Sequence, residues 1–143
     1  MFRRLFAFIV LFVVFGAGPA LAQQCLHGTN ESAEQAARQR DALTATRTIN
    51  NIQANQPGAA KGQYFRQDEL AGAPFAVRLR ESTSETVRRI SLNPGTDILP
   101  NWKLTLDVTR TGYWFMIKDT SDPCGFAYIS NQAGVIFQAE PIR

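Results

Sequence analysis

Residues 102–137 constrain the fold most, because apolar and polar side chains alternate along them. Every second residue from Trp102 to Val108 is apolar, and polar residues stand between them. A period of two is typical of a strand with one buried face. Thr111-Gly112 then predicts a tight turn, because glycine accepts the positive φ that short hairpins need.

The residues after this turn predict the rest of an antiparallel meander. The next strand, 113–117, places its odd-numbered residues on one face and Trp114 and Met116 on the other. A run of Asp, Thr, Ser and Pro predicts a loop at 119–123, and two more strands follow up to Phe137.

A long helix is predicted before the meander, from about residue 32 to residue 54. Asn30 or Ser32 can cap its N-terminus, and apolar residues recur at steps of three and four from Ala42 to Ile52. The helix should end before Pro57, because proline disfavours helix in the residue that precedes it.

Two further strands are predicted between the helix and the meander. Phe75, Val77 and Leu79 alternate with Arg78 and Arg80 after Pro74, and residues 86–92 alternate less regularly. The sequence therefore predicts an α+β fold, with one N-terminal helix packed on a single antiparallel sheet of about four to six strands.

The first 22 residues predict a secretory signal peptide. Arg3 and Arg4 precede an unbroken apolar run, and Ala20 and Ala22 are small residues of the kind that signal peptidase requires. The apolar run is shorter than the ~18 residues of a membrane span. We therefore expect a periplasmic or secreted protein in which residues 23–143 form one domain that leaves the membrane after cleavage. The alternative is an uncleaved N-terminal anchor.

Charge gives no indication of a nucleic-acid partner. The whole chain has 15 basic and 12 acidic residues, and its formal net charge is +3. Two of the arginines belong to the predicted signal peptide, so 15 − 2 = 13 basic residues remain against 12 acidic ones. Arg88-Arg89 is the densest basic point, and no basic run with interleaved aromatic residues appears.

The two cysteines, Cys25 and Cys124, predict a disulfide if the chain is exported. The bond would join the segment before the helix to the loop that ends at residue 124. Cys25 lies two residues from the only histidine, His27, but no orienting group or oxyanion donor accompanies that pair. One histidine and two cysteines also make a poor zinc site. We expect no catalytic site, no cofactor and no metal centre.

Asp119 and Asp122 flank the loop that carries Cys124, and they allow two interpretations. Their side chains can accept hydrogen bonds from backbone amides within the turn. They can also contribute to a calcium site, although two carboxylates fall short of the six to eight oxygen ligands that calcium takes. The turn interpretation is the stronger one.

Trp114 and Met116 are candidates for a contact with another protein. Strand alternation directs them away from the face that carries Phe115. The simpler interpretation is that one set of aromatic residues packs under the helix and the other is partly exposed. The functional interpretation is that Trp114 and Met116 belong to a protein-binding surface.

Several motifs together resemble the soluble part of type IV pilins and type II secretion pseudopilins. They are the helical stretch from Ala42 to Asn50, the Gly-Gln-Tyr-Phe segment at 62–65, and the chain end from Gly112 to Phe137. The resemblance implies a pilin-like α+β domain that binds protein in the cell envelope, and it is compatible with a homo-oligomer.

The sequence also departs from the pilin pattern. Pilins keep a long apolar helix after a short leader that is cut at a glycine, and a glutamate follows soon after the cut. Here Gly16 and Gly18 lack that context, and the first glutamate is Glu31. Pilins also commonly pair two cysteines near the C-terminus, whereas Cys25 is close to the predicted mature start.

These observations favour an exported, non-enzymatic protein-interaction or assembly module. It would be part of the cell envelope, or associated with it or with a pilus or secretion apparatus, and its partner would be a protein there. The alternative is a small secreted enzyme inhibitor or hydrolase that uses the loop from Asp119 to Cys124.

We expect the native protein to begin at Gln23, because signal peptidase cuts after a small residue such as Ala22. N-terminal sequencing of the protein isolated from its native cells measures this directly. A protein that starts at Met1 and stays in the membrane fraction would contradict the prediction and favour the anchored alternative.

Overall fold

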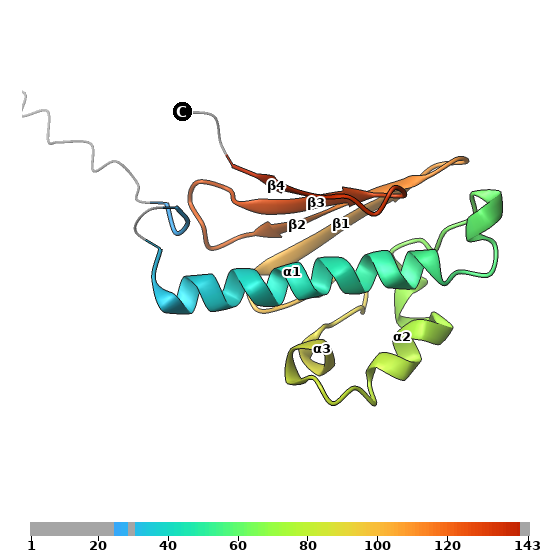
Figure 1. Ribbon diagram of the computed structural model, residues 1–143, viewed down its shortest axis with the longest axis horizontal. Helices are drawn as coiled ribbons and strands as arrows, with labels where there is room; N and C mark the ends of the chain where they lie inside the picture. Colours follow the sequence, from blue (N-terminus) through green and yellow to red (C-terminus); the bar gives the residue numbers. More distant parts are fainter. Residues whose placement is uncertain (1–24, 29–30, 141–143) are drawn as a thin grey trace, which may run out of the picture.

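The computed structural model describes residues 25–28 and 31–140, so the predicted signal peptide lies outside the described residues. Within them, a long helix, α1 (Ala33–Ala54), packs on a four-stranded antiparallel sheet whose strands lie in sequence order (Figure 1). The strands are β1 (Trp102–Val108), β2 (Tyr113–Asp119), β3 (Ala127–Asn131) and β4 (Ile136–Ala139). The predicted α+β class is confirmed.

Helix α1 begins and ends at the signals that the sequence contains. Its N-terminus is closed by a reciprocal pair, in which Gln35 N donates to Ser32 Oγ over 3.2 Å and Ser32 N donates to Gln35 Oε1 over 2.8 Å. Its buried apolar residues are Ala42, Ala45, Ile49 and Ile52. Because two of these four are alanine, the helix axis can approach the sheet closely.

The strand alternation produces one buried sheet face. Phe115 and Ile117 of β2 are fully buried, as is nearly all of Trp102 at the start of β1. Trp102 meets the Phe126 ring edge-on at 6.1 Å between centroids, and Phe126 meets Tyr128 in the same way at 5.2 Å. This aromatic cluster fills the space under α1 and forms much of the core.

The predicted turn between β1 and β2 is present, but the expected positive φ at Gly112 is not. Thr109 N donates to Gly112 O over 2.8 Å and closes the hairpin. Gly112 does not have a positive φ. A Cβ at this position would lie 2.7 Å from Gln132 Oε1, so the absence of a side chain makes room for Gln132.

The two strands predicted before the meander are wrong, because both segments form short helices. These are α2 (Pro74–Leu79) and α3 (Glu85–Arg89). Pro74 occupies the first turn of α2, where its missing N–H costs no hydrogen bond and its fixed φ suits a helix. Ser84 caps α3, since its Oγ accepts a 3.4 Å hydrogen bond from Val87 N.

The alternation of apolar residues after Pro74 matches the period of a strand, but the segment folds as a helix and buries a different set of side chains. Ala76 is buried and Val77 is 49 % exposed, which no one-sided strand through Phe75 and Val77 would give. Two 3₁₀ turns, at Ala59–Lys61 and Leu70–Gly72, complete the connection between α1 and α2. The sheet is therefore built from the meander alone.

Figure 1 shows how the layers are arranged. Helix α1 runs along one side of the sheet, and α2 and α3 lie beyond α1, so these three helices all share that side. In the described part of the chain, no helix is both long enough and apolar enough to cross a membrane.

Candidate functional site

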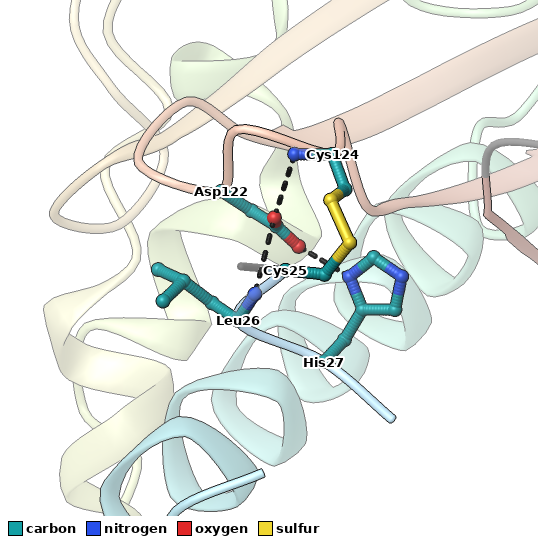
Figure 2. Close-up of a disulfide and its surroundings, with 5 residues drawn as sticks. All are labelled: Cys25, Leu26, His27, Asp122 and Cys124. Atoms are coloured by element: carbon teal, nitrogen blue, oxygen red, sulfur yellow. Dashed lines mark hydrogen bonds and ion pairs between the residues drawn. A yellow bond between two sulfur atoms is a disulfide. The ribbon is translucent and has the colours of Figure 1, made fainter. Parts of the chain in front are cut away.

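The N-terminal segment is attached to the loop between β2 and β3 by a disulfide (Figure 2). Cys25 and Cys124 are 99 residues apart in sequence, and their Cα atoms are 5.2 Å apart. The predicted bond is therefore confirmed. It fixes residues 25–28 at the end of the sheet where β2 ends and β3 begins.

Asp122 reinforces the disulfide by binding both sides of it. Its Oδ1 accepts hydrogen bonds from Cys124 N at 2.9 Å and Leu26 N at 3.3 Å, and its Oδ2 is bonded to His27 Nδ1. Burial alone would raise the pKa of the Asp122 carboxyl, but the bonds from His27, Cys124 and Leu26 hold that pKa below its usual value. The carboxylate is therefore ionised at neutral pH.

Asp119, the other loop carboxylate, binds α1. Arg38 Nη2 lies 3.1 Å from Asp119 Oδ1 and 3.2 Å from Oδ2, and it also donates to Ser121 Oγ over 2.8 Å. Ser121 N and Oγ both donate to Asp119 Oδ1. Both aspartates thus accept hydrogen bonds from amides within their own loop, as the turn interpretation predicts, and each also binds a side chain from the N-terminal part of the chain.

His27 and Asp122 form the arrangement closest to catalytic chemistry in the described residues. Their side chains are 6 % and 1 % exposed, and the His27 ring lies 5.2 Å from the Phe126 ring. The neighbouring sulfur atoms are joined to each other, so neither is a thiol nucleophile. No three His, Cys, Asp or Glu side chains of residues 25–28 and 31–140 gather as a group that could hold a metal. The geometry of this junction is that of a structural clamp.

The opposite face of the sheet carries the predicted contact residues. Trp114 is 41 % exposed while its neighbour Phe115 is fully buried, so the two side chains lie on opposite faces as predicted. Met116 lies on the face of Trp114 and is half-buried.

Strand register adds an apolar row to this face that the sequence analysis missed. Met116 of β2 pairs with Ile129 of β3, and Ile129 pairs with Phe137 of β4. Phe137 is 54 % exposed, and Val135 just before β4 is 50 % exposed. Alternation in the sequence of the last two strands could have placed Ile129 and Phe137 on one face. Only the strand register shows that Met116, Ile129 and Phe137 are neighbours. We call Trp114, Met116, Ile129 and Phe137 the outer apolar row.

Charged residues lie on both sides of the outer apolar row, next to β2. On one side Lys103 and Lys118 are direct cross-strand partners, and on the other side Asp107 accepts a 3.3 Å hydrogen bond from Trp114 Nε1. This bond links the indole ring to β1. The face is thus an apolar strip with charged borders, and α1, α2 and α3 all lie on the other side of the sheet (Figure 1).

Comparison of the chain with protein-family models, with curated proteins and with solved structures found no match. The resemblance to pilins therefore rests on the sequence motifs alone.

Replacing Cys25 and Cys124 by serine should lower the unfolding free energy sharply. The closed loop restricts the unfolded chain, and the chain-entropy model gives ~4–5 kcal/mol for a loop of about 100 residues. Urea unfolding of the oxidised protein and of the double variant measures the difference. Mild reduction should reproduce it in the natural protein and leave the double variant unchanged. Two free thiols in protein isolated under non-reducing conditions, or a bond between two chains, would contradict the assignment.

Asp122→Asn should weaken the dependence of stability on pH between about pH 5 and pH 3, where carboxyl groups titrate. The folded pKa is lowered, so the ionised carboxylate stabilises the fold above its unfolded pKa, and this contribution is lost as the pH falls through the folded pKa. At pH 7 the variant should lose roughly 1–3 kcal/mol, as when a buried charged hydrogen bond is broken.

Urea unfolding at a series of pH values tests this dependence on Asp122. Asp97→Asn is the matched control, because Asp97 is exposed and forms no ion pair in the described residues. Equal pH profiles for the natural protein and Asp122→Asn would show that the carboxylate does not stabilise the junction.

Proposed function

We propose that this chain is an exported, non-enzymatic protein-interaction or assembly module that binds a protein of the cell envelope through the outer apolar row. The observation that carries the proposal is the cross-strand alignment of Met116, Ile129 and Phe137, with Trp114 beside them, on the sheet face opposite the helices. Exposed apolar strips with polar borders are typical of protein contacts.

The chemistry of the row favours a protein partner. Tryptophan, methionine and phenylalanine are enriched at the centres of protein interfaces, where they exclude water from the contact. Trp114 is already held by its bond to Asp107, so little rotamer entropy is lost when a partner covers the ring. The lysine pair at 103 and 118 offers positive charge at one border, which would favour an acidic group on the partner.

Export and the pilin resemblance belong to the same proposal. A disulfide that joins distant parts of a small domain is typical of proteins in oxidising compartments, which supports a periplasmic or secreted location. One long helix on an antiparallel meander is compatible with a pilin-like domain associated with a pilus or secretion apparatus. The enzyme or inhibitor alternative is less favoured, because both loop carboxylates bind groups of the chain itself.

Trp114→Ala should weaken binding to the partner much more than it weakens folding. The partner is first isolated from envelope extracts on the immobilised mature protein, and its affinity is then measured with purified components. A central aromatic residue of an interface typically contributes ≥ 2 kcal/mol, so we expect the Kd to rise by about thirtyfold or more. Phe137→Ser should act in the same direction.

Val77→Ala is the matched control, because Val77 is as exposed as Trp114 but lies on α2, away from the outer face. It should leave the Kd unchanged. Loss of ~3–5 kcal/mol of stability in Trp114→Ala, as for a buried aromatic residue, would place Trp114 in the core and refute the proposal. An unchanged Kd in both Trp114→Ala and Phe137→Ser would refute it as well.

A further inference from the structure

Strand β1 leaves one edge of the sheet open to pairing. It is an outermost strand, so only one of its two edges is bonded to β2. Thr109 N donates to Gly112 O, and in an antiparallel ladder the backbone groups of alternate residues point the same way. The odd-numbered residues of β1 therefore bond to β2, and the N–H and C=O groups of Leu104, Leu106 and Val108 point outward.

Half of this edge is already occupied by a side-chain amide. Gln67 Nε2 donates to Leu104 O over 3.3 Å, and Leu106 N donates to Gln67 Oε1 over 3.2 Å. A primary amide has the same donor and acceptor as a peptide unit. Gln67 therefore bonds to β1 much as one peptide unit of a further strand would. The edge can thus bind an amide N–H donor together with an amide C=O acceptor.

The other half of the edge faces a groove. The N–H of Val108 has no hydrogen-bond partner among residues 25–28 and 31–140, because it points away from β2 and Gln67 reaches only as far as Leu106. A groove of about 900 Å³ lies beside it, between residues 62–69 and the end of β1. Its volume is in the range of sites that bind small ligands.

The far wall of the groove is held in place from two sides. Gln53 of α1 is fully buried, and its amide bonds to both backbone groups of Phe65, with both distances 2.8 Å. Gly62 packs so closely on the β1–β2 turn that a Cβ there would lie 3.2 Å from Arg110 O. The groove is thus a preformed feature, which lowers the entropy cost of binding.

We propose that this groove binds an extended peptide segment of another protein, which adds to the sheet beside β1. Its backbone pairs with Leu106 O and with the N–H and C=O of Val108, continuing the pattern that Gln67 begins. Leu106 and Val108 are half-buried and pack against the core, so the peptide side chain above them is apolar. Acidic and basic residues both line the groove, so main-chain bonds rather than net charge carry the affinity.

This site is distinct from the outer apolar row. The peptide lies at the edge of β1, whereas the row runs across β2, β3 and β4. One protein can therefore use both, and the two proposals succeed or fail separately. Variants of Val108 test the groove, and Trp114→Ala tests the row.

The test uses a displayed library of linear peptides of about ten residues, long enough for a strand, selected against the full mature protein. Selected peptides are resynthesised and their Kd values are measured. Val108→Pro removes the outward N–H and is acceptable at a sheet edge, where proline breaks no ladder bond. It should raise the Kd by about tenfold or more, which is about 1.4 kcal/mol. Val108→Thr keeps the N–H and the branched shape, and should bind like the natural protein, as should Trp114→Ala.

Two measurements keep the test decisive if Val108→Pro folds poorly. Methylation of the peptide nitrogens at one set of alternate residues should abolish binding, while methylation of the other set should not, because only one set faces β1. In the natural protein, saturating peptide should slow hydrogen exchange of the Val108 amide at least about tenfold, as a new hydrogen bond requires.

The proposal is overturned if no selected peptide binds in solution, or if both methylated sets bind equally well. It is also overturned if Val108→Pro folds and binds like the natural protein, or if the selected peptides lose affinity only with Trp114→Ala. Self-association of the protein through β1, detected as a concentration-dependent mass that Val108→Pro abolishes, would assign the edge to a second copy and refute the peptide site.

Discussion

The attachment of the β2–β3 loop to the N-terminal part of the chain is the constraint on which the rest of the structure depends. Helix α1 presents an apolar stripe in which two of the four buried residues are alanine, so hydrophobic burial alone holds its first turns weakly. The disulfide, the Asp122 hydrogen bonds and the Arg38–Asp119 ion pair all act at that end. At the other end, Asn50 bonds to Ser130 and accepts from Tyr113, with distances of 2.9 Å and 3.1 Å. The helix is thus fixed at both ends by polar contacts, and Ala42, Ala45 and Ile49 pack between them.

Helices α1, α2 and α3 all lie on one side of the sheet, which leaves one sheet face covered and the other exposed. The core is complete under α1, and burial raises the pKa of Tyr113, which faces the helix, to about 12. On the other face, apolar side chains remain exposed although they form a continuous row. The proposed function assigns these side chains to a contact with a partner protein, which would cover them.

The sequence was sufficient for the parts of the structure that local patterns control. The period of two in the meander, the Ser32 cap and the pairing of the only two cysteines all predicted what the structure contains. It was insufficient where a short segment fitted both the strand period of two and the helical period of about 3.6. In α2, Pro74 at the first turn and the burial of Ala76 favour the helix. It was also insufficient for relations between distant residues. Neither the row through Ile129 nor the bond from Gln67 to β1 can be deduced before the strand register and the path of the connection are known.

The separation of the two cysteines also governs the order of events when the chain folds. Cys25 is synthesised before its partner, which emerges 99 residues later, after α1, the small helices and the first hairpin. The contacts of α1 with β3 are also long-range, as the bond between Asn50 and Ser130, 80 residues apart, shows. Such long-range contacts make folding slow, because the entropy of closing a long loop is lost before the contacts form. During synthesis, therefore, the helix has no sheet to pack on, and the nascent chain must remain unassembled until the second hairpin has left the ribosome.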